Sequence, residues 1–182
     1  MTVPESAESA SERSSAGGVG GRPSSGLTAL VVTVSTRASA GVYEDRSGPI
    51  LVAGLREAGF EVGDPLVVPD GDEVSDALRD AVAAGHAVVV TTGGTGLSPD
   101  DHTPEQTRAV IEREVPQLSA AIAAYGVAHG VPTAVLSRGV AGTVGGTLVV
   151  NVPGSRGGAR DAMSVLGPVL QHAVAQLRGG DH

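Results

Sequence analysis

Residues 87–104 read AVVVTTGGTGLSPDDHTP, an apolar run followed by three glycines and then by two adjacent aspartates. The run at 87–90 has the composition of a strand that is covered on both faces of a parallel sheet. A glycine-rich turn that leaves such a strand can bring backbone N–H groups close to phosphates, and neighbouring carboxylates can hold a metal ion or a proton. We therefore expect the chemistry of this protein to lie in this segment.

The pattern around this segment predicts an α/β fold with a mostly parallel sheet. From residue 27 onward, short β-branched runs alternate with alanine-rich amphipathic stretches, which is typical of parallel strands joined by crossover helices. The predicted strands are 27–35, 62–68, 86–92, 133–137 and 147–152, and the predicted helices are 47–59, 72–84, 104–113, 116–128 and 159–178. Residues 139–146 are predicted to form an irregular strand or hairpin. Asp72 and Thr103 are the predicted N-caps of the second and third helices, and Gly85 ends the second.

Composition excludes several classes of site. The 182 residues suit one domain with a sizeable core, and the absence of cysteine excludes disulfides, thiolate metal sites and cysteine nucleophiles. All 12 basic residues are arginines, so a phosphate-binding lysine is excluded as well. A net charge of −8 with 2% aromatic residues argues against general nucleic-acid binding. Bound phosphate would need backbone amides, arginine or a divalent cation.

Two expectations concern the ends of the chain and its location. Residues 1–26 are rich in serine and glycine and nearly devoid of large apolar side chains, so we predict a disordered tail before a domain at 27–179. The sequence has no run of 18 apolar residues and no export signal at its start, which predicts no membrane segment and a cytoplasmic location.

Polar or glycine-rich turns follow all five predicted strands. In open parallel sheets, ligands bind beyond the carboxyl ends of the strands, so these turns are expected to form one cleft. The candidate binding residues are Ser35, Asp70, Gly93, Gly94, Thr95, Gly96, Asp101, Ser137, Arg138, Asn151, Pro153 and Gly154.

The two aspartates of this set predict a magnesium site. An acidic phosphate site without lysine needs a cation to offset repulsion, and Mg²⁺ is commonly held by one or two carboxylates plus substrate phosphates. Asp70 and Asp101 are the expected ligands, with Mn²⁺ as an alternative ion. Two simpler interpretations stay open: Asp101 as a cap of the helix near residue 104, and Asp70 as a turn residue.

Five sequence blocks occur in an order and spacing that resemble a known family. The chain is similar to the MogA/MoaB family of molybdenum cofactor biosynthesis proteins, which includes the G domain of gephyrin, over essentially all of 27–179. The blocks are VSTRASAGVYEDRSGP (34–49), VVPD (67–70), TTGGTGLSPDDHTPE (91–105), LSRGVAG (136–142) and TLVVNVPGS (147–155).

The resemblance implies a three-layer α/β/α sandwich that assembles as a homotrimer, or as a hexamer, and cooperates with other proteins of cofactor biosynthesis. It also implies binding of molybdopterin and transfer of AMP from Mg-ATP to the terminal phosphate of that pterin, with release of pyrophosphate. By motif, the essential aspartates of the family fall on Asp70 and Asp101, its glycine-threonine turn on 93–96, its pterin-side serine on Ser137 and its N-x-P-G turn on 151–154.

Three positions depart from the family pattern. Thr36 stands where many members have an aspartate, Asp100 stands where a basic residue often precedes the second essential aspartate, and Ser155-Arg156-Gly157 replaces a lysine or a second proline. The first two changes leave an alternative open: a MoaB-like pterin- or nucleotide-binding oligomeric protein with little or no adenylyltransferase activity. Retention of Asp70 and Asp101 favours the enzyme.

Overall fold

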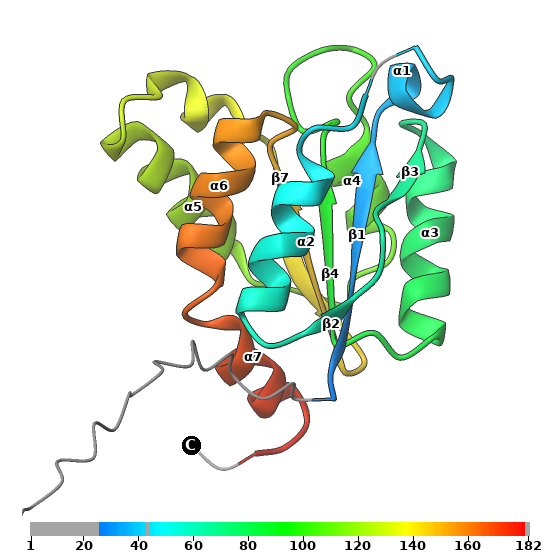
Figure 1. Cartoon of the computed structure of the whole chain (residues 1–182), viewed down its shortest axis with the longest axis vertical. Helices are drawn as coiled ribbons and strands as arrows, with labels where there is room; N and C mark the ends of the chain where they lie inside the picture. The colour runs from blue at the N-terminus through cyan, green and yellow to red at the C-terminus, as the bar shows by residue number, and fades with distance from the viewer. Residues whose placement is uncertain (1–25, 43, 181–182) are drawn as a thin grey trace, which may run out of the picture.

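The structure, a computed structural model, describes residues 26–42 and 44–180 and contains a mixed sheet with helices on both faces (Figure 1). The strand order is β2-β1-β4-β7-β6-β5, and β3 also pairs with β1. All pairs among β1, β2, β3, β4 and β7 are parallel, whereas β6 is antiparallel to β7 and to β5. The strands are β1 (Thr28–Val34), β2 (Glu61–Val62), β3 (Leu66–Val68), β4 (Val88–Thr92), β5 (Arg113–Glu114), β6 (Ala141–Val144) and β7 (Thr147–Val152).

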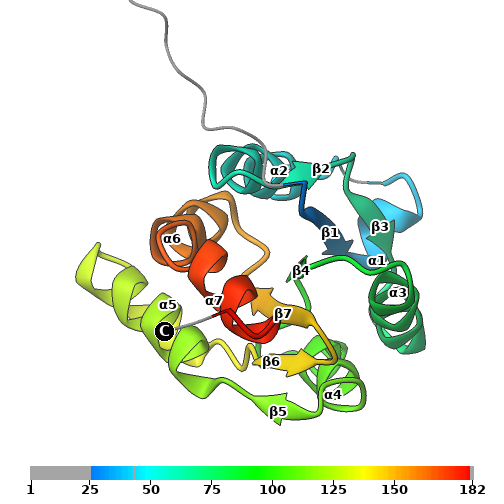
Figure 2. The same cartoon turned by 90° about the horizontal axis from the view of Figure 1, so that it is seen from below.

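Two layers of helices cover this sheet, which confirms the expected α/β/α architecture (Figure 2). The side chains of α2, α5, α6 and α7 pack on one face, and those of α3 pack on the other, next to α4. The helices are α1 (Thr36–Ser39), α2 (Gly48–Glu57), α3 (Asp72–Ala83), α4 (Thr103–Arg108), α5 (Pro116–Ala128), the 3₁₀ helix η1 (Pro132–Leu136), α6 (Arg156–Leu166) and α7 (Leu170–Leu177).

The central strands feed both cores because successive side chains along a strand point to opposite faces. In β4, Val88 and Val90 belong to the core under α2 and α6, while Val89 belongs to the core under α3. All three valines are fully buried. The continuous apolar run in this strand is therefore explained by helices on both sides.

The predicted strand at 133–137 is wrong, because Pro132–Leu136 forms η1. Pro132 occupies the start of this helix, where the lack of an N–H costs nothing and the fixed φ favours a helical turn. The side chains of Val135 and Leu136 are 64% and 51% exposed, so the apolar residues that suggested a buried strand lie on the surface.

The predicted helix at 159–178 is two helices, α6 and α7, with Pro168 between them. Proline lacks the N–H that would continue the helical hydrogen bonds, and its ring clashes with the preceding turn. The predicted core side chains nevertheless pack in one cluster across the break: Met163, Leu166, Leu170, Val174 and Leu177.

Other helix and strand boundaries differ from the predicted ones by smaller amounts. The strand predicted at 62–68 is divided into β2 and β3 by a segment that contains Pro65, and the helix predicted at 104–113 ends at Arg108, so that residues 113 and 114 form β5. The N-caps of α3 and α4 are Gly71 and His102, so Asp72 and Thr103 are the first helical residues rather than the caps. The irregular strand or hairpin predicted at 139–146 is the strand β6 with the turn after it, and β6 pairs antiparallel with β7, which begins at Thr147.

The edges of the sheet are short and polar. One edge consists of β5, whose two residues Arg113 and Glu114 are both exposed, and the other consists of β2 and β3, which are separated by Pro65. No helix among the described residues is long and apolar enough to cross a membrane. Apart from Gly26, the predicted tail at 1–26 lies outside the described residues.

Candidate functional site

The glycine turn after β4 is set by close backbone packing. Gly93 and Gly94 have φ values of +105° and +61°, a region that L-residues with a side chain rarely adopt. A Cβ at Gly93 would collide with the carbonyl oxygen of Val34, and one at Gly94 would collide with the Asp70 carboxylate and the Thr103 hydroxyl. Both glycines are thus required where the turn passes β1 and the start of α4.

Asp70, which follows β3, connects that strand end to the start of α4. Its carboxylate accepts hydrogen bonds from the His102 backbone N–H at 3.1 Å and from the Thr103 hydroxyl at 3.4 Å. The Asp70 N–H donates to the Thr36 hydroxyl at 3.4 Å. Burial raises the pKa of the Asp70 carboxyl above its ordinary value of 3.8. The hydrogen bonds from His102 and Thr103 oppose this shift, and the negative charge of Asp101 adds to it. The two candidate aspartates therefore influence one another electrostatically.

Asp101 lies in the wall of a cleft at this edge of the sheet, here called the main cleft, with a volume of about 410 Å³. Its carboxylate accepts from the Ser98 backbone N–H at 3.2 Å, so it closes the turn before α4 rather than capping that helix. The neighbouring Asp100 is exposed and is absent from the cleft wall. Of the adjacent pair, only Asp101 is therefore available to a ligand in this cleft.

Arg138 is engaged by the protein itself. Its guanidinium donates to the carbonyl oxygens of Gly96 at 2.7 Å and Asp101 at 2.6 Å, and it forms an ion pair with Glu105. The Arg138 N–H also donates to the Thr95 carbonyl at 2.8 Å. This side chain fastens both ends of the 96–101 loop, and it does not line the cleft.

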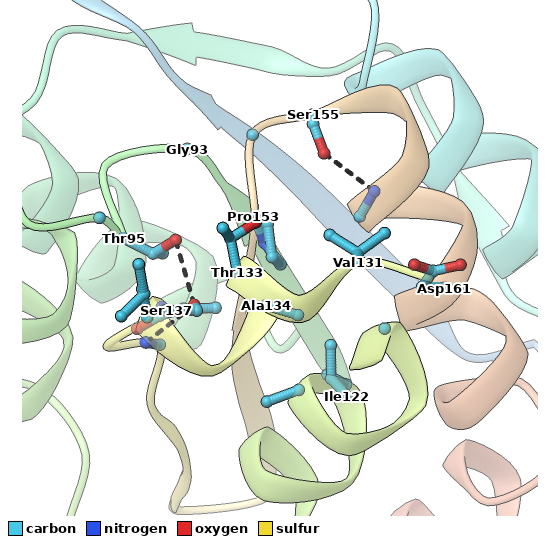
Figure 3. A pocket seen from close by; sticks show the side chains of 18 of the residues that line it. Gly93, Thr95, Ile122, Val131, Thr133, Ala134, Ser137, Pro153, Ser155 and Asp161 are labelled. Atoms are coloured by element: carbon cyan, nitrogen blue, oxygen red, sulfur yellow. Dashed lines mark hydrogen bonds between the residues drawn. The ribbon is translucent and has the colours of Figure 1, made fainter. Parts of the chain in front are cut away.

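Ser137 and Thr95 lie side by side at one end of the cleft. The Ser137 hydroxyl donates to the Thr95 hydroxyl at 3.4 Å, and it accepts from the Gly139 N–H at 3.3 Å (Figure 3). Both residues line the cleft. Although Ser137 follows η1 instead of a strand, it lies beside the glycine turn, and both of its side-chain hydrogen bonds are long.

Asn151, Pro153 and Gly154, at the end of β7, form the floor of the same cleft. The Asn151 side chain is committed to the fold: its Oδ1 accepts from the Val140 N–H at 3.0 Å, and its Nδ2 donates to the hydroxyls of Thr91 at 2.9 Å and Thr107 at 2.8 Å. We infer that Asn151 shapes the cleft, while the turn after it is the part that a ligand can touch.

Ser35 lies in a second cleft at the same edge of the sheet, with a volume of about 460 Å³. Its hydroxyl accepts from the Ala38 N–H at 3.1 Å and caps the short helix α1. This second cleft shares Gly93, Gly154 and Ser155 with the main one. Ser35 and Asp70 are thus neighbours of the main cleft but are not part of its wall.

The sequence-based prediction missed the outer wall of the cleft. This wall comes from α5, η1 and α6, and its residues include Ile122, Gly126, Val131, Ala134 and Asp161 (Figure 3). A usable signal was present in α5, whose sequence PQLSAAIAAYGVA has small residues on every side and so does not have a single apolar stripe.

Fold and cleft define the class: an α/β protein that gathers a glycine turn and carboxylates beyond the ends of parallel strands to bind a small molecule. The family described as probable molybdopterin binding domain matches residues 30–172 of this chain. The chain therefore belongs to that family, whose members include the MogA and MoaB proteins.

Individual relatives agree with this assignment. The molybdopterin adenylyltransferase of Haemophilus influenzae is 39% identical over 136 residues, which cover 70% of this chain and 68% of that protein. A solved structure of MogA is 52% identical with a TM-score of 0.80, and the match covers 82% of this chain and 99% of that one. The bifunctional molybdenum cofactor biosynthesis protein of Synechococcus elongatus is 35% identical over 158 residues, or 86% of this chain, and the match spans about half, 49%, of its length.

Proposed function

We propose that this protein is a molybdopterin adenylyltransferase of molybdenum cofactor biosynthesis. It binds molybdopterin and transfers AMP from Mg-ATP to the terminal phosphate of the pterin, releasing pyrophosphate. The observation that carries the proposal is one cleft whose wall combines the glycine turn, Asp101 and Ser137, in a chain whose relatives include proteins named molybdopterin adenylyltransferase.

The reaction asks the protein mainly to position two polyanions. An oxygen of the pterin phosphate attacks the α-phosphorus of ATP and forms a new P–O bond, while the bond from the α-phosphorus to the bridging oxygen breaks and pyrophosphate leaves with the electron pair. No covalent bond to the protein is needed. Orientation of the two substrates and stabilisation of the charge that develops on the phosphates therefore accelerate the reaction. In the proposal, backbone N–H groups of 93–96 bind phosphate oxygens, and Ser137 binds the pterin side.

Asp70 and Asp101 are the proposed ligands of Mg²⁺. No group of three or more histidine, cysteine or acidic side chains that could hold a metal ion occurs within 26–42 and 44–180. Two carboxylates suit an ion that shares its coordination with substrate phosphates and water, as Mg²⁺ commonly does. The donor set therefore fits Mg²⁺ that arrives with ATP, and the ion would neutralise phosphate charge when bound.

A homotrimer is the proposed assembly, with a hexamer as the alternative. Exposed apolar side chains on α5 and η1 support self-association: Val127, Val135 and Leu136 are 41%, 64% and 51% exposed. We further propose a cytoplasmic location and contacts with other proteins of cofactor biosynthesis, and no role for nucleic acid or membrane binding. Sedimentation equilibrium of the full chain measures the assembly directly, and a monomer at micromolar concentration would contradict it.

One observation favours the second candidate, a MoaB-like binder with little activity. Thr36 occupies a position where many relatives carry an aspartate, and its hydroxyl accepts a hydrogen bond from the Asp70 N–H. This corner of the site thus has one carboxylate fewer to share a cation. Both essential aspartates are retained, which is why the enzyme is the leading proposal.

The deciding experiment mixes the purified full chain with molybdopterin, Mg²⁺ and ATP and measures adenylylated pterin and pyrophosphate. We expect turnover in the wild type, none without Mg²⁺, and none in Asp101→Asn, which should still bind the pterin. Asp100→Asn is the matched control, because this adjacent carboxylate lies outside the cleft wall; its turnover should be nearly unchanged. If the wild type binds pterin but never forms the adenylate, the second candidate, a MoaB-like binding protein, is correct.

A further inference from the structure

One carboxylate in the outer wall of the main cleft has no partner among residues 26–42 and 44–180. Asp161 of α6 is partly buried, and its side chain makes no hydrogen bond or ion pair with any of the described residues. Figure 3 shows it projecting beside Val131, at the other end of the cleft from Thr95 and Ser137. Neither the glycine turn nor the two essential aspartates explain why an acid stands here.

Small and apolar residues lie beside Asp161. A Cβ on Gly126 of α5 would lie 3.7 Å from the Asp161 Oδ2 and 2.8 Å from the Ala134 Cβ, so the glycine keeps this space open. Ile122 and Val131 also line the cleft, as do Ser119 and Thr133, and no arginine lies among the lining residues. A carboxylate that a ligand shields from water needs hydrogen-bond donors, so the ligand itself must supply them.

We propose that Asp161 binds the aminopyrimidinone edge of the pterin and makes this end of the cleft selective for it. This inference rests on the proposed function. A pterin presents a ring N–H beside an amino group, and these two adjacent donors match the two oxygens of one carboxylate. Adenine presents its amino group beside an acceptor nitrogen, which a carboxylate repels. The apolar side chains of Ile122 and Val131 suit the faces of a flat ring.

Asp161 is therefore a specificity-determining residue, and it sets the direction of the bound substrate. With the ring held between α5 and α6, the phosphate end of the pterin extends toward the glycine turn and Ser137, where phosphate transfer is proposed. A lone carboxylate is a poor alternative site for a cation, because divalent ions need several further oxygen ligands.

The test uses two uncharged probes that need no turnover. The full chain is titrated with 6-hydroxymethylpterin and with its 2,4-dioxo analogue, 6-hydroxymethyl-lumazine, and binding is followed by probe fluorescence. The wild type should prefer the pterin. In Asp161→Asn, pterin affinity should fall about 10- to 100-fold, the cost of a charge-assisted hydrogen bond, and the preference should shift toward lumazine. The asparagine amide can donate to the 2-oxo group and accept from the ring N–H.

Matched measurements separate this role from folding and from the proposed reaction. Asp80→Asn removes the same charge from an exposed position of α3, on the other face of the sheet, and should leave both affinities unchanged. Melting of each variant reports folding. If folded Asp161→Asn keeps the wild-type preference, or if it weakens ATP and not pterin, the assignment is overturned. If the protein binds pterin through Asp161 but does not adenylylate it, the proposed function is wrong and the role of Asp161 stands.

Discussion

Replacing Asn151 by alanine is expected to destabilise the fold by about 3 kcal/mol, even though the residue lies in the cleft wall. The Val140 N–H would lose its acceptor at 3.0 Å and stay buried, at a cost of about 1–3 kcal/mol. The hydroxyls of Thr91 and Thr107 would each lose a hydrogen bond worth about 0.5–1 kcal/mol. Thr107 still donates to the Thr103 carbonyl, which limits its share. Residue 151 is only 2% exposed, so these partners are shielded from water in the wild type.

Urea unfolding and thermal melting measure this effect. A loss of about 3 kcal/mol corresponds to a melting temperature lower by about 10 °C in a chain of this size. Ser137→Ala is the control, because this neighbouring cleft residue makes hydrogen bonds of 3.3 and 3.4 Å that contribute little, and it should cost less than about 1 kcal/mol. If Asn151→Ala melts within about 2 °C of the wild type and loses pterin binding, Asn151 acts on the substrate and the structural role is wrong.

Two further predictions concern the polar groups around the glycine turn. Because burial raises the pKa of Asp70, stability is lost as the pH rises from the ordinary carboxyl range through that raised pKa, and the full cost is present above it; Asp70→Asn should therefore melt higher than the wild type at pH 7. The difference in melting temperature between the two proteins should narrow as the pH falls and Asp70 becomes protonated in the wild type. A difference that does not depend on pH would contradict burial of the charged carboxylate as its cause. Arg138→Lys should lower kcat about tenfold, because an ammonium cannot bridge the carbonyls that a guanidinium spans. Glu105→Gln, which breaks only the exposed ion pair, should have a much smaller effect, and equal losses in the two variants would refute the role of the carbonyl contacts.

The sequence predicted best those elements whose local pattern agrees with their burial. The runs at 86–92 and 147–152 are buried strands β4 and β7, since β-branched residues in them face helices on both sides. At 133–137 the same residue types form η1, because Pro132 starts a helical turn and no position beside β4 or β7 is free for another strand. Pro168 divides the predicted last helix for an equally local reason, and that break was visible in the sequence.

The cleft was predictable only on its sheet side. The turns after β4 and β7 contribute to it through chain topology, which the alternation of strands and helices already indicates. Asp161 and Gly126 contribute through the packing of α5 against α6. The sequence of one helix does not reveal which other helix it will pack against. Arg138 was a candidate binding residue in the sequence, but it binds backbone carbonyls and Glu105 instead, and contacts to backbone cannot be predicted from residue types.

Both edges of the sheet are unsuited to pairing with another chain. On one side β5 offers only two exposed residues of opposite charge, and on the other side Pro65 interrupts the edge between β2 and β3. Short, charged or proline-containing edges prevent strands from adding to a sheet. Copies of this protein must therefore associate through helices and loops, so a concentrated solution should form closed assemblies rather than fibres built by sheet extension.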